Sequence, residues 1–493
     1  MLCPKCGGEN PGNAHVCEAC STALIKAMTS KLAIVSLVLG ILSLFFFILT
    51  GIPAIVVGII SLLKIRRSNG ALKKGKYIAL AGMNVSIVFM CIFYILWSRD
   101  APPIPNDYTI ADLRSAPAEY AESYELLKML IDEDHNVPGA PAIGLSDGDI
   151  DMIADIRDVV ENGTEAEVAQ VLKHDANDIK AAWASSQKAR NIIRRLNQFP
   201  EIADLAEPGY NFRIMRYTNL VELVRLFQVY AYLQTDPDHI HAFTIELIEL
   251  DSVSRKLSLN ARLFIERFIC HLCLETTIKA SNAIVNHPKT SKNTIELLAT
   301  HFTLLNEEQL SLRNSVLFEY LLIKNAVLNN SGVSLTGKIP LLKRHSTLRL
   351  YKNRCDDCLN AMEQTGNTTT ERLSVWPVHY PFKETDPFRN GKLLLLIYRG
   401  YNPLGSTGIQ GMRFFSNINQ KKGFRLLVRN DLLQVVLNKR LGKNVSTKAR
   451  AYGDEYIIDV KNKKIFSPGP DGKVGTKDDI ELRINPKVLG WGN

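Results

Sequence analysis

CPKCGGENPGNAHVCEAC, residues 3–20, opens this 493-residue chain, and two long apolar stretches, 32–63 and 77–97, follow it. The opening segment holds two Cys-x-x-Cys pairs separated by 10 residues. Each pair supplies two thiolates from one tight turn, and zinc binds four such ligands in a tetrahedron. We therefore predict a zinc ribbon over residues 1–25 that binds a structural Zn²⁺, with two disulfides or unliganded thiols as the alternative. The predicted ligands are Cys3, Cys6, Cys17 and Cys20.

The apolar stretches have the dimensions of membrane helices. A single helix over 32–63 would be about 48 Å long, well beyond a hydrocarbon core of about 30 Å. Gly51 and Pro53 favour a break into two arms. We therefore predict a transmembrane domain over 32–97, in contact with the lipid bilayer, with spans at about 32–49, 52–63 and 77–97.

The basic residues indicate how the chain crosses the membrane. Residues 1–97 contain nine Lys or Arg and two Asp or Glu, whereas the rest of the chain contains 50 and 48. The net charge of +9 is therefore a topology signal, and we expect no nucleic-acid binding. The N-terminus and the basic loop 64–76 should be cytoplasmic. With three spans through a bacterial inner membrane, residues 98–493 then lie in the periplasm. With two spans, the large domain would stay in the cytoplasm. We expect no cleavable signal peptide.

The remainder of the chain divides by composition. Residues 98–107 form a Pro-rich linker, and apolar residues at spacings of three and four predict a helical ectodomain over 108–335. After residue 336, Gly, Pro and aromatic residues become more frequent, which indicates a small α+β C-terminal unit over 336–493 with a helix near 430–441. The predicted fold is thus multi-domain: zinc ribbon, α-helical membrane anchor, mainly α-helical ectodomain and α+β unit. Its predicted strands are 393–398, 424–428, 456–460, 464–467 and 480–484.

Both N-terminal segments resemble known bacterial families. Residues 3–10, Cys-Pro-Lys-Cys-Gly-Gly-Glu-Asn, resemble the zinc-ribbon knobs at the N-termini of many bacterial membrane proteins. Residues 32–97 resemble a small bacterial membrane domain of unknown function, which implies an anchor and assigns no activity. The residues that carry this second resemblance are 34–42, 52–54, Gly58, 64–67 and 79–82.

A Gly-rich acidic loop lies near the C-terminus, with the sequence SPGPDGKVGTKDDI at residues 467–480. Carboxylates on such a loop suit Ca²⁺, which takes oxygen ligands. The stretch is similar to the calcium loop of the major pseudopilins of type II secretion, and 386–388 with 393–399 matches the element that precedes it. The resemblance implies Ca²⁺ ligands at Asp471, Asp478 and Asp479. An insertion at 400–450 and the lack of a pilin helix depart from that family, and an ordinary surface turn is the alternative.

Other residues with ligand or nucleophile chemistry favour structural interpretations. Cys270/Cys273 and Cys355/Cys358 would favour disulfides outside the cytoplasm, locally or between the pairs, but Cys270 lies mid-helix, which favours buried structural thiols. Asp236, just before His239 and His241, is best explained as a helix cap.

The sequence contains no nucleotide-binding loop, no Gly-x-Ser-x-Gly motif and no zincin histidine pair, so we expect a non-enzymatic envelope scaffold or binding module that binds a protein partner. The alternative is a periplasmic hydrolase or thiol-redox enzyme. It would use His239 and His241, or Cys355 and Cys358, in a deep pocket that joins them.

Overall fold

The computed structural model describes residues 1–491 except for 4, 13, 15, 23–29, 47, 68–74, 99–101, 132–142, 206–207, 209–216, 235, 330–343, 367–402, 445, 449–454 and 470–471. The described chain is mostly helical and ends in a small antiparallel sheet. Its residues fall into two compact units, 1–98 and 102–491.

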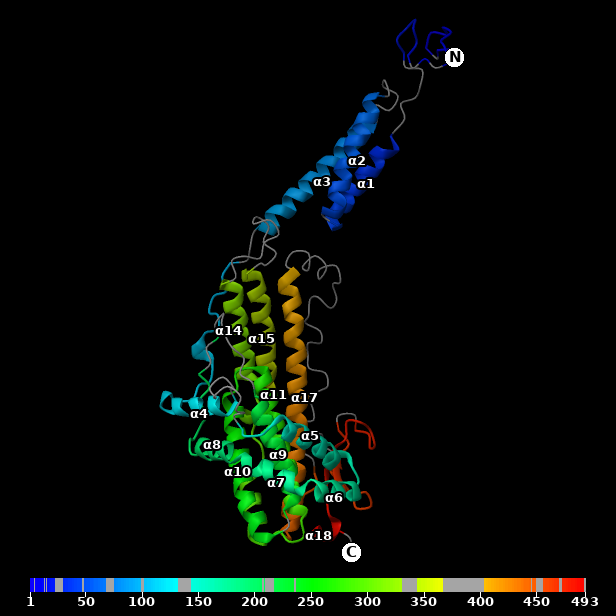
Figure 1. The fold of residues 1–493 in the computed structure, drawn as a ribbon. Helices are drawn as coiled ribbons and strands as arrows, with labels where there is room; N and C mark the ends of the chain where they lie inside the picture. The colour runs from blue at the N-terminus through cyan, green and yellow to red at the C-terminus, as the bar shows by residue number, and fades with distance from the viewer. Residues whose placement is uncertain are drawn as a thin grey trace. The chain divides into compact units, whose positions relative to one another are not determined.

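The first unit contains three apolar helices that pack against one another in all three pairs (Figure 1). They are α1 (Lys31–Phe46), α2 (Ile48–Arg67) and α3 (Gly75–Ser98). The predicted break at residues 50–53 is wrong, because these residues lie inside α2. Pro53 is tolerated there although it removes one backbone donor of the helix. The second arm is consequently a full helix of 20 residues, about 30 Å long.

The second unit is built mainly from helices, and several of them start at a polar capping residue. In five of them the side chain before the helix accepts a hydrogen bond from the backbone N–H three residues later. These caps are Ser146, Thr164, Asp236, Ser291 and Asn306. The helical elements are η1 (Ile110–Asp112), η2 (Ala118–Tyr120), α4 (Ala121–Ile131), α5 (Asp147–Asn162), α6 (Glu165–His174), α7 (Ala176–Ser185), α8 (Gln187–Asn197), α9 (Thr218–Leu233), α10 (Pro237–Asn260), α11 (Phe264–Asn286), α12 (Lys292–His301), α13 (Glu307–Leu310), α14 (Arg313–Asn329), α15 (Arg344–Gly366), α17 (Pro403–Arg440) and α18 (Pro486–Leu489).

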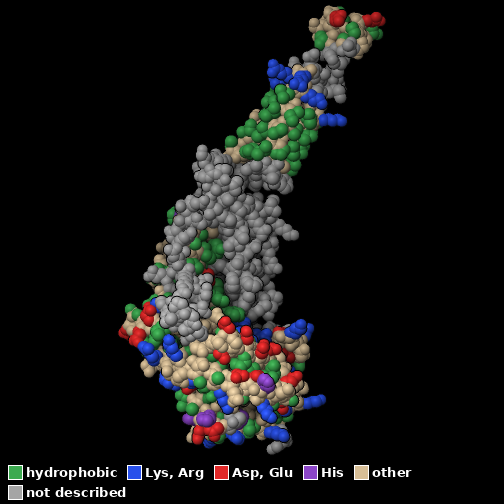
Figure 2. Space-filling view, in the orientation of Figure 1, with side chains coloured by type: hydrophobic (Ala, Val, Ile, Leu, Met, Phe, Trp, Pro, Cys, Tyr) green, Lys and Arg blue, Asp and Glu red, His purple; other side chains and the backbone are tan. Residues whose placement is uncertain are grey.

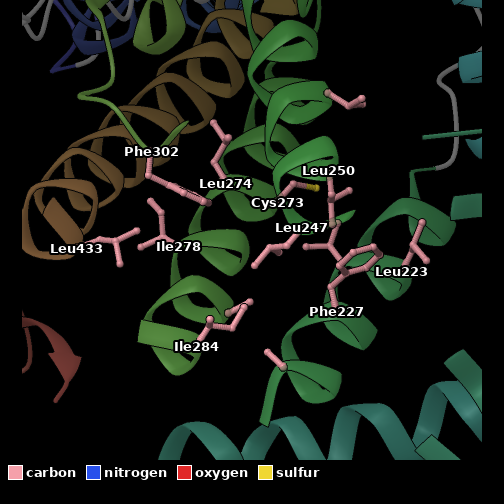
Figure 3. Close-up of a cluster of buried hydrophobic side chains, with 14 of the residues drawn as sticks. Leu223, Phe227, Leu247, Leu250, Cys273, Leu274, Ile278, Ile284, Phe302 and Leu433 are labelled. Atoms are coloured by element: carbon pink, nitrogen blue, oxygen red, sulfur yellow. The ribbon is translucent and has the colours of Figure 1, made fainter. Parts of the chain in front are cut away.

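The main core of this unit lies between α9, α10, α11 and α17. Figure 3 shows Phe227 of α9, Leu247 of α10, Ile278 of α11 and Leu433 of α17 converging on it. The same core includes strand residues such as Ile465, so the C-terminal sheet and the helices share one hydrophobic interior. A second, smaller core joins α14 and α15.

The sheet has three antiparallel strands in the order β1-β2-β3: β1 (Ile457–Asp459), β2 (Lys464–Ser467) and β3 (Ile480–Arg483). Three predicted strands are therefore confirmed. The predicted strand 424–428 is wrong, because these residues lie within the 38-residue helix α17, which also contains most of the predicted helix 430–441. A short apolar run cannot by itself distinguish a strand from a buried helix. The predicted strand 393–398 lies outside the described residues.

A buried charged network joins four helices of the main core. The fully buried Asp251 of α10 accepts hydrogen bonds from Arg255 Nε (2.6 Å), His301 Nε2 of α12 (3.0 Å) and Thr277 Oγ1 of α11 (2.6 Å). Arg255 Nη2 also reaches Asn430 Oδ1 of α17 at 3.5 Å. Burial alone would raise the pKa of Asp251, but these cationic and hydrogen-bonding neighbours lower it to about 2.

Candidate functional site

The four N-terminal cysteines form one compact cluster. Their sulfur atoms all lie within 4.8 Å of one another, with 3.6 Å between Cys3 and Cys20 and 3.6 Å between Cys6 and Cys17. A tetrahedron with Zn–S bonds of about 2.3 Å has edges of about 3.8 Å, close to these separations. A disulfide needs about 2.05 Å, and all four thiols are free, so the disulfide alternative is wrong.

Two repeated turns place the four sulfur atoms. In the first, Cys3 N–H donates to Gly8 O (2.9 Å) and Gly7 N–H donates to Cys3 O (2.9 Å). In the second, Cys17 N–H donates to Thr22 O (2.8 Å) and Ser21 N–H donates to Cys17 O (2.8 Å). Gly7 and Ser21 occupy the same position of the two turns, with φ of +70° and +56°. The left-handed conformation therefore explains Gly7 and is a small strain at Ser21.

Asn10, which the sequence did not indicate as a site residue, holds the cluster in place through its side-chain hydrogen bonds. Its side chain is buried and donates to Cys17 Sγ (3.5 Å) and Gly8 O (2.8 Å), while it accepts from Glu18 N–H (2.9 Å). Burial would raise the pKa of Cys17, but Asn10 and nearby backbone donors lower it to about 6, which favours the thiolate that binds metals. Four thiols in this arrangement fit a structural Zn²⁺ and leave no open coordination position for catalysis.

The three helices of the first unit place their side chains in the reverse of the usual order. Inside the bundle lie small residues: Ala33, Ser36, Gly40, Ser43, Gly51, Ala54, Gly58, Ser61, Ala79, Gly82 and Ser86. Large apolar side chains are exposed instead, and Figure 2 shows them as an almost continuous hydrophobic surface. They include Ile34, Val35, Val38, Ile41, Ile52, Val56, Ile59, Ile60, Leu63, Ile87, Val88 and Ile92. Small interior residues are typical of helices that pack within lipid.

The backbones of these helices approach one another closely. A Cβ added to Gly58 would lie 2.4 Å from Met83 Cγ, and one added to Gly82 would lie 2.7 Å from Leu37 N. The buried hydroxyl of Ser36 donates to Ala54 O (2.8 Å) and that of Ser86 donates to Gly82 O (3.0 Å). These polar groups are therefore satisfied inside the bundle, as an apolar surrounding requires.

The basic residues of the three apolar helices gather at one end of the bundle. A Cβ on Gly75 would lie 2.9 Å from Ser30 N and 3.3 Å from Ile65 Cδ1, so α1 starts, α2 ends and α3 starts at the same end. Figure 2 shows Lys and Arg side chains clustered at this end of the bundle. Their described members are Lys31, Lys64, Arg66, Arg67 and Lys76. Among the described residues, Gly75–Ile92 of α3 is the helix that is long and apolar enough to cross a membrane, and Lys31–Ser43 is a shorter apolar helix.

The acidic loop between β2 and β3 is described only in part. Gly469, Gly472 and Gly475 all have positive φ, which explains why glycine recurs there. Asp478 accepts a hydrogen bond from Thr476 Oγ1, and Asp479 Oδ2 accepts one from Gly475 N–H at 2.9 Å. Asp471 and residues 386–388 lie outside the described residues. Among the described residues, the side chains that come together in a group of three or more possible metal ligands are the four cysteines, and the acidic loop does not form such a group. The calcium site therefore stays a prediction.

The cysteines that the sequence pairs in the second unit lie in separate cores. Cys270 and Cys273 are free and buried in α11, in the main core, whereas Cys355 of α15 belongs to the smaller core. Burial raises the pKa of Cys270 to about 12, and Figure 3 shows the Cys273 sulfur among apolar side chains. Such thiols are poor nucleophiles. The side chain of Cys358 lies outside the described residues.

The histidine pair of the enzyme alternative has structural partners. Asp236 accepts a hydrogen bond from His239 N–H (3.3 Å) and caps α10, as predicted, while His241 Nδ1 lies 3.0 Å from Thr294 Oγ1. His239 is exposed at the start of the helix, whereas Cys355 is buried in α15. The described structure therefore does not gather these histidines and Cys355 into one site.

Comparison with known proteins gives one match. Residues 32–96 match a family described as a domain of unknown function (DUF4190). The match covers the three apolar helices, and with the long apolar helix α3 it suggests association with a membrane. No curated protein and no solved structure matches the chain.

Proposed function

We propose that this protein is a membrane-anchored scaffold of the bacterial envelope. In this proposal α1, α2 and α3 span the inner membrane, the zinc ribbon lies in the cytoplasm, and residues 98–493 bind a protein partner in the periplasm. The observation that carries the proposal is the inverted arrangement of the bundle, with Gly, Ala and Ser inside and Ile, Val and Leu outside.

The inverted arrangement would be costly in water. Moving one large aliphatic side chain out of water gains about 1.5–3 kcal/mol, and the bundle exposes many of them. In a bilayer the same side chains contact lipid, and small interior residues allow close packing. Helices α2 and α3, with 20 and 24 residues, would be about 30 and 36 Å long, which suits a core of about 30 Å.

The position of the basic residues supports the proposed topology. Lys and Arg flank membrane helices preferentially on the cytoplasmic side, and here they lie at the end where α1 starts, α2 ends and α3 starts. Three passes then bring the C-terminal end of α3 to the opposite side. Residues 98–493, whose charges nearly balance, follow that end and suit protein–protein contact.

Two metal ions complete the proposal. Zn²⁺ held by the four thiolates would order the cytoplasmic ribbon. The similarity of residues 467–480 to a pseudopilin calcium loop supports a Ca²⁺ ion held by Asp471, Asp478 and Asp479. This second ion rests on the resemblance and on the glycine conformations of the loop.

Reporter fusions test the topology. An enzyme that is active only outside the cytoplasm, fused after Asn493, should be active, whereas the same enzyme fused after Arg67 should be silent. A fluorescent protein that matures only in the cytoplasm should give the opposite pattern at the two positions. A silent C-terminal fusion of full length, with a fluorescent counterpart, would contradict the three-pass arrangement and favour two passes.

A further inference from the structure

A polar groove lies where the C-terminal sheet meets the helices of the second unit. Its volume is about 440 Å³, and its walls come from the end of α5, from α9, α11 and α17, and from β2, β3 and the loop between them. These segments are distant in sequence and converge in the fold (Figure 1). Asp479 of the acidic loop lines the same groove.

Basic side chains dominate one wall of the groove. Arg425 and Arg429 of α17 line it, together with Lys279 of α11. Lys279 pairs with Glu161 (3.0 Å), and it shares Glu275 with Arg429. Arg425 has no carboxylate partner among the described residues and is partly exposed in the groove lining, so its guanidinium is available to a ligand.

A second cation, which has no carboxylate partner among the described residues, lies beside this wall. Lys422 precedes Arg425 by three residues on α17, so the two share one face of the helix. Its described partner is the ring of Phe268, 4.4 Å from Nζ. Burial lowers the pKa of Lys422, and the neighbouring Arg429, Lys279 and Arg425 lower it further against the opposing effect of Glu275. The wall therefore has a surplus of positive charge.

The groove also contains a buried acceptor. Gln228 of α9 lines the groove and is 1% exposed. Its Nε2 donates to Glu161 Oε1 at 3.1 Å, but its Oε1 has no partner among the described residues. Arg429 Nε is likewise a buried donor without a described partner. A buried polar atom without a partner is costly, and a ligand with matching groups would remove that cost.

We propose that this groove binds a small organic anion that also carries hydroxyl or N–H donors. Arg425 and Arg429 would contact its anionic group, since guanidinium groups bind carboxylates and phosphates through paired hydrogen bonds. Gln228 would accept from one of its donors. This binding site goes beyond the scaffold role and does not depend on the membrane topology.

Isothermal titration calorimetry of the full chain in detergent, with D-glucuronate as the probe, tests the proposal. Glucuronate carries both a carboxylate and hydroxyl donors, glucose lacks the charge, and sulfate lacks the donors. We expect saturable binding of glucuronate, weaker binding of sulfate and none of glucose. If glucose binds as tightly as glucuronate, the site does not recognise charge. If sulfate binds as tightly, the site does not recognise hydrogen-bond donors. The absence of glucuronate binding at tens of millimolar would overturn the site.

A matched pair of variants locates the binding. Arg425→Gln removes a partly exposed charge and should weaken glucuronate binding about tenfold or more, because it deletes charge-assisted hydrogen bonds. Lys461→Gln removes one positive charge at the exposed β1–β2 turn, outside the groove, and should leave the affinity within twofold of the native value. Equal affinities of the two variants would refute the assignment even if the native chain binds the probe.

Discussion

The carbonyl oxygen of Gly82 lies 2.5 Å from the position that a Cβ on Gly40 would occupy. At this crossing the backbone of α1 contacts the backbone of α3, without a side-chain layer between them. Water-soluble helix pairs are instead held apart by interdigitating apolar side chains. The Gly40–Gly82 contact is therefore a point at which the bundle has no room for an added side chain.

Gly40→Val should destabilise the bundle. Its first side-chain carbon has no room against Gly82, so α1 and α3 must separate, at a cost of about 1–3 kcal/mol or more. Loss of monodisperse protein after heating in detergent measures this effect, and the midpoint should fall by several degrees. Val38→Leu changes an exposed residue of the same helix and should leave the midpoint nearly unchanged. Equal midpoints for the two variants would contradict the close packing.

The sequence predicts the existence of the three apolar helices better than their boundaries or packing. Gly51, two residues before Pro53, predicts a turn. It lies instead within α2, where an added Cβ would be 3.1 Å from Met90 Sδ. Glycine serves close packing there, not a chain reversal. Which face of each helix points inward cannot be predicted from hydropathy alone, because large apolar residues lie outside and glycines inside the same apolar stretch.

The cysteine cluster was fully predictable and the groove was not. Cys3, Cys6, Cys17 and Cys20 lie within 18 residues, so their spacing alone brings the thiolates together. Gln228 and Arg425 are almost 200 residues apart and meet only through tertiary packing of α9, α11 and α17. Because a strand was predicted at 424–428, the sequence did not indicate that Arg425 and Lys422 lie on the same face of a helix.

Purified native protein should contain one equivalent of Zn²⁺ per chain by elemental analysis. Cys17→Ser should lower this content severely, because three thiolates leave the tetrahedron open and Ser cannot replace a thiolate. Cys91→Ser, which changes an exposed thiol on α3, is the matched control and should retain the metal. Full zinc content in the Cys17→Ser protein would mean that the ligand set is wrong.

Asp251→Asn should both destabilise the second unit and change its response to acid. The variant leaves the Arg255 guanidinium buried without its carboxylate partner, which should cost about 3–5 kcal/mol at pH 7. The folded-state pKa of Asp251, about 2, lies below its usual value of 3.8. Its ionisation therefore contributes about 2 kcal/mol above pH 4, and this is lost as the pH falls toward 2.

Urea denaturation followed by tryptophan fluorescence, to which Trp183 stacked on Tyr230 contributes, measures the Asp251 effect at pH 7 and pH 3. The native protein should lose more stability between these values than Asp251→Asn does. Asp238→Asn, at an exposed position in the first turn of the same helix, should keep the native pH dependence. Parallel pH profiles for native protein and Asp251→Asn would exclude this carboxylate as the titrating group.

Calcium should stabilise the C-terminal sheet if Asp471, Asp478 and Asp479 bind one ion. Without it their charges repel one another on a short loop, so Ca²⁺ at 100 times its dissociation constant should stabilise the second unit by about 2.7 kcal/mol. Chelator should lower the melting temperature, and Asp478→Ala should abolish the calcium response while the helices stay folded. Asp459→Asn, at the end of β1 in the same sheet, should keep the response, because Asp459 accepts hydrogen bonds from Asn462 outside the loop. Identical melting curves of the native chain with calcium and with chelator would leave 468–479 as an ordinary turn, in which Asp479 accepts its hydrogen bond from Gly475 N–H.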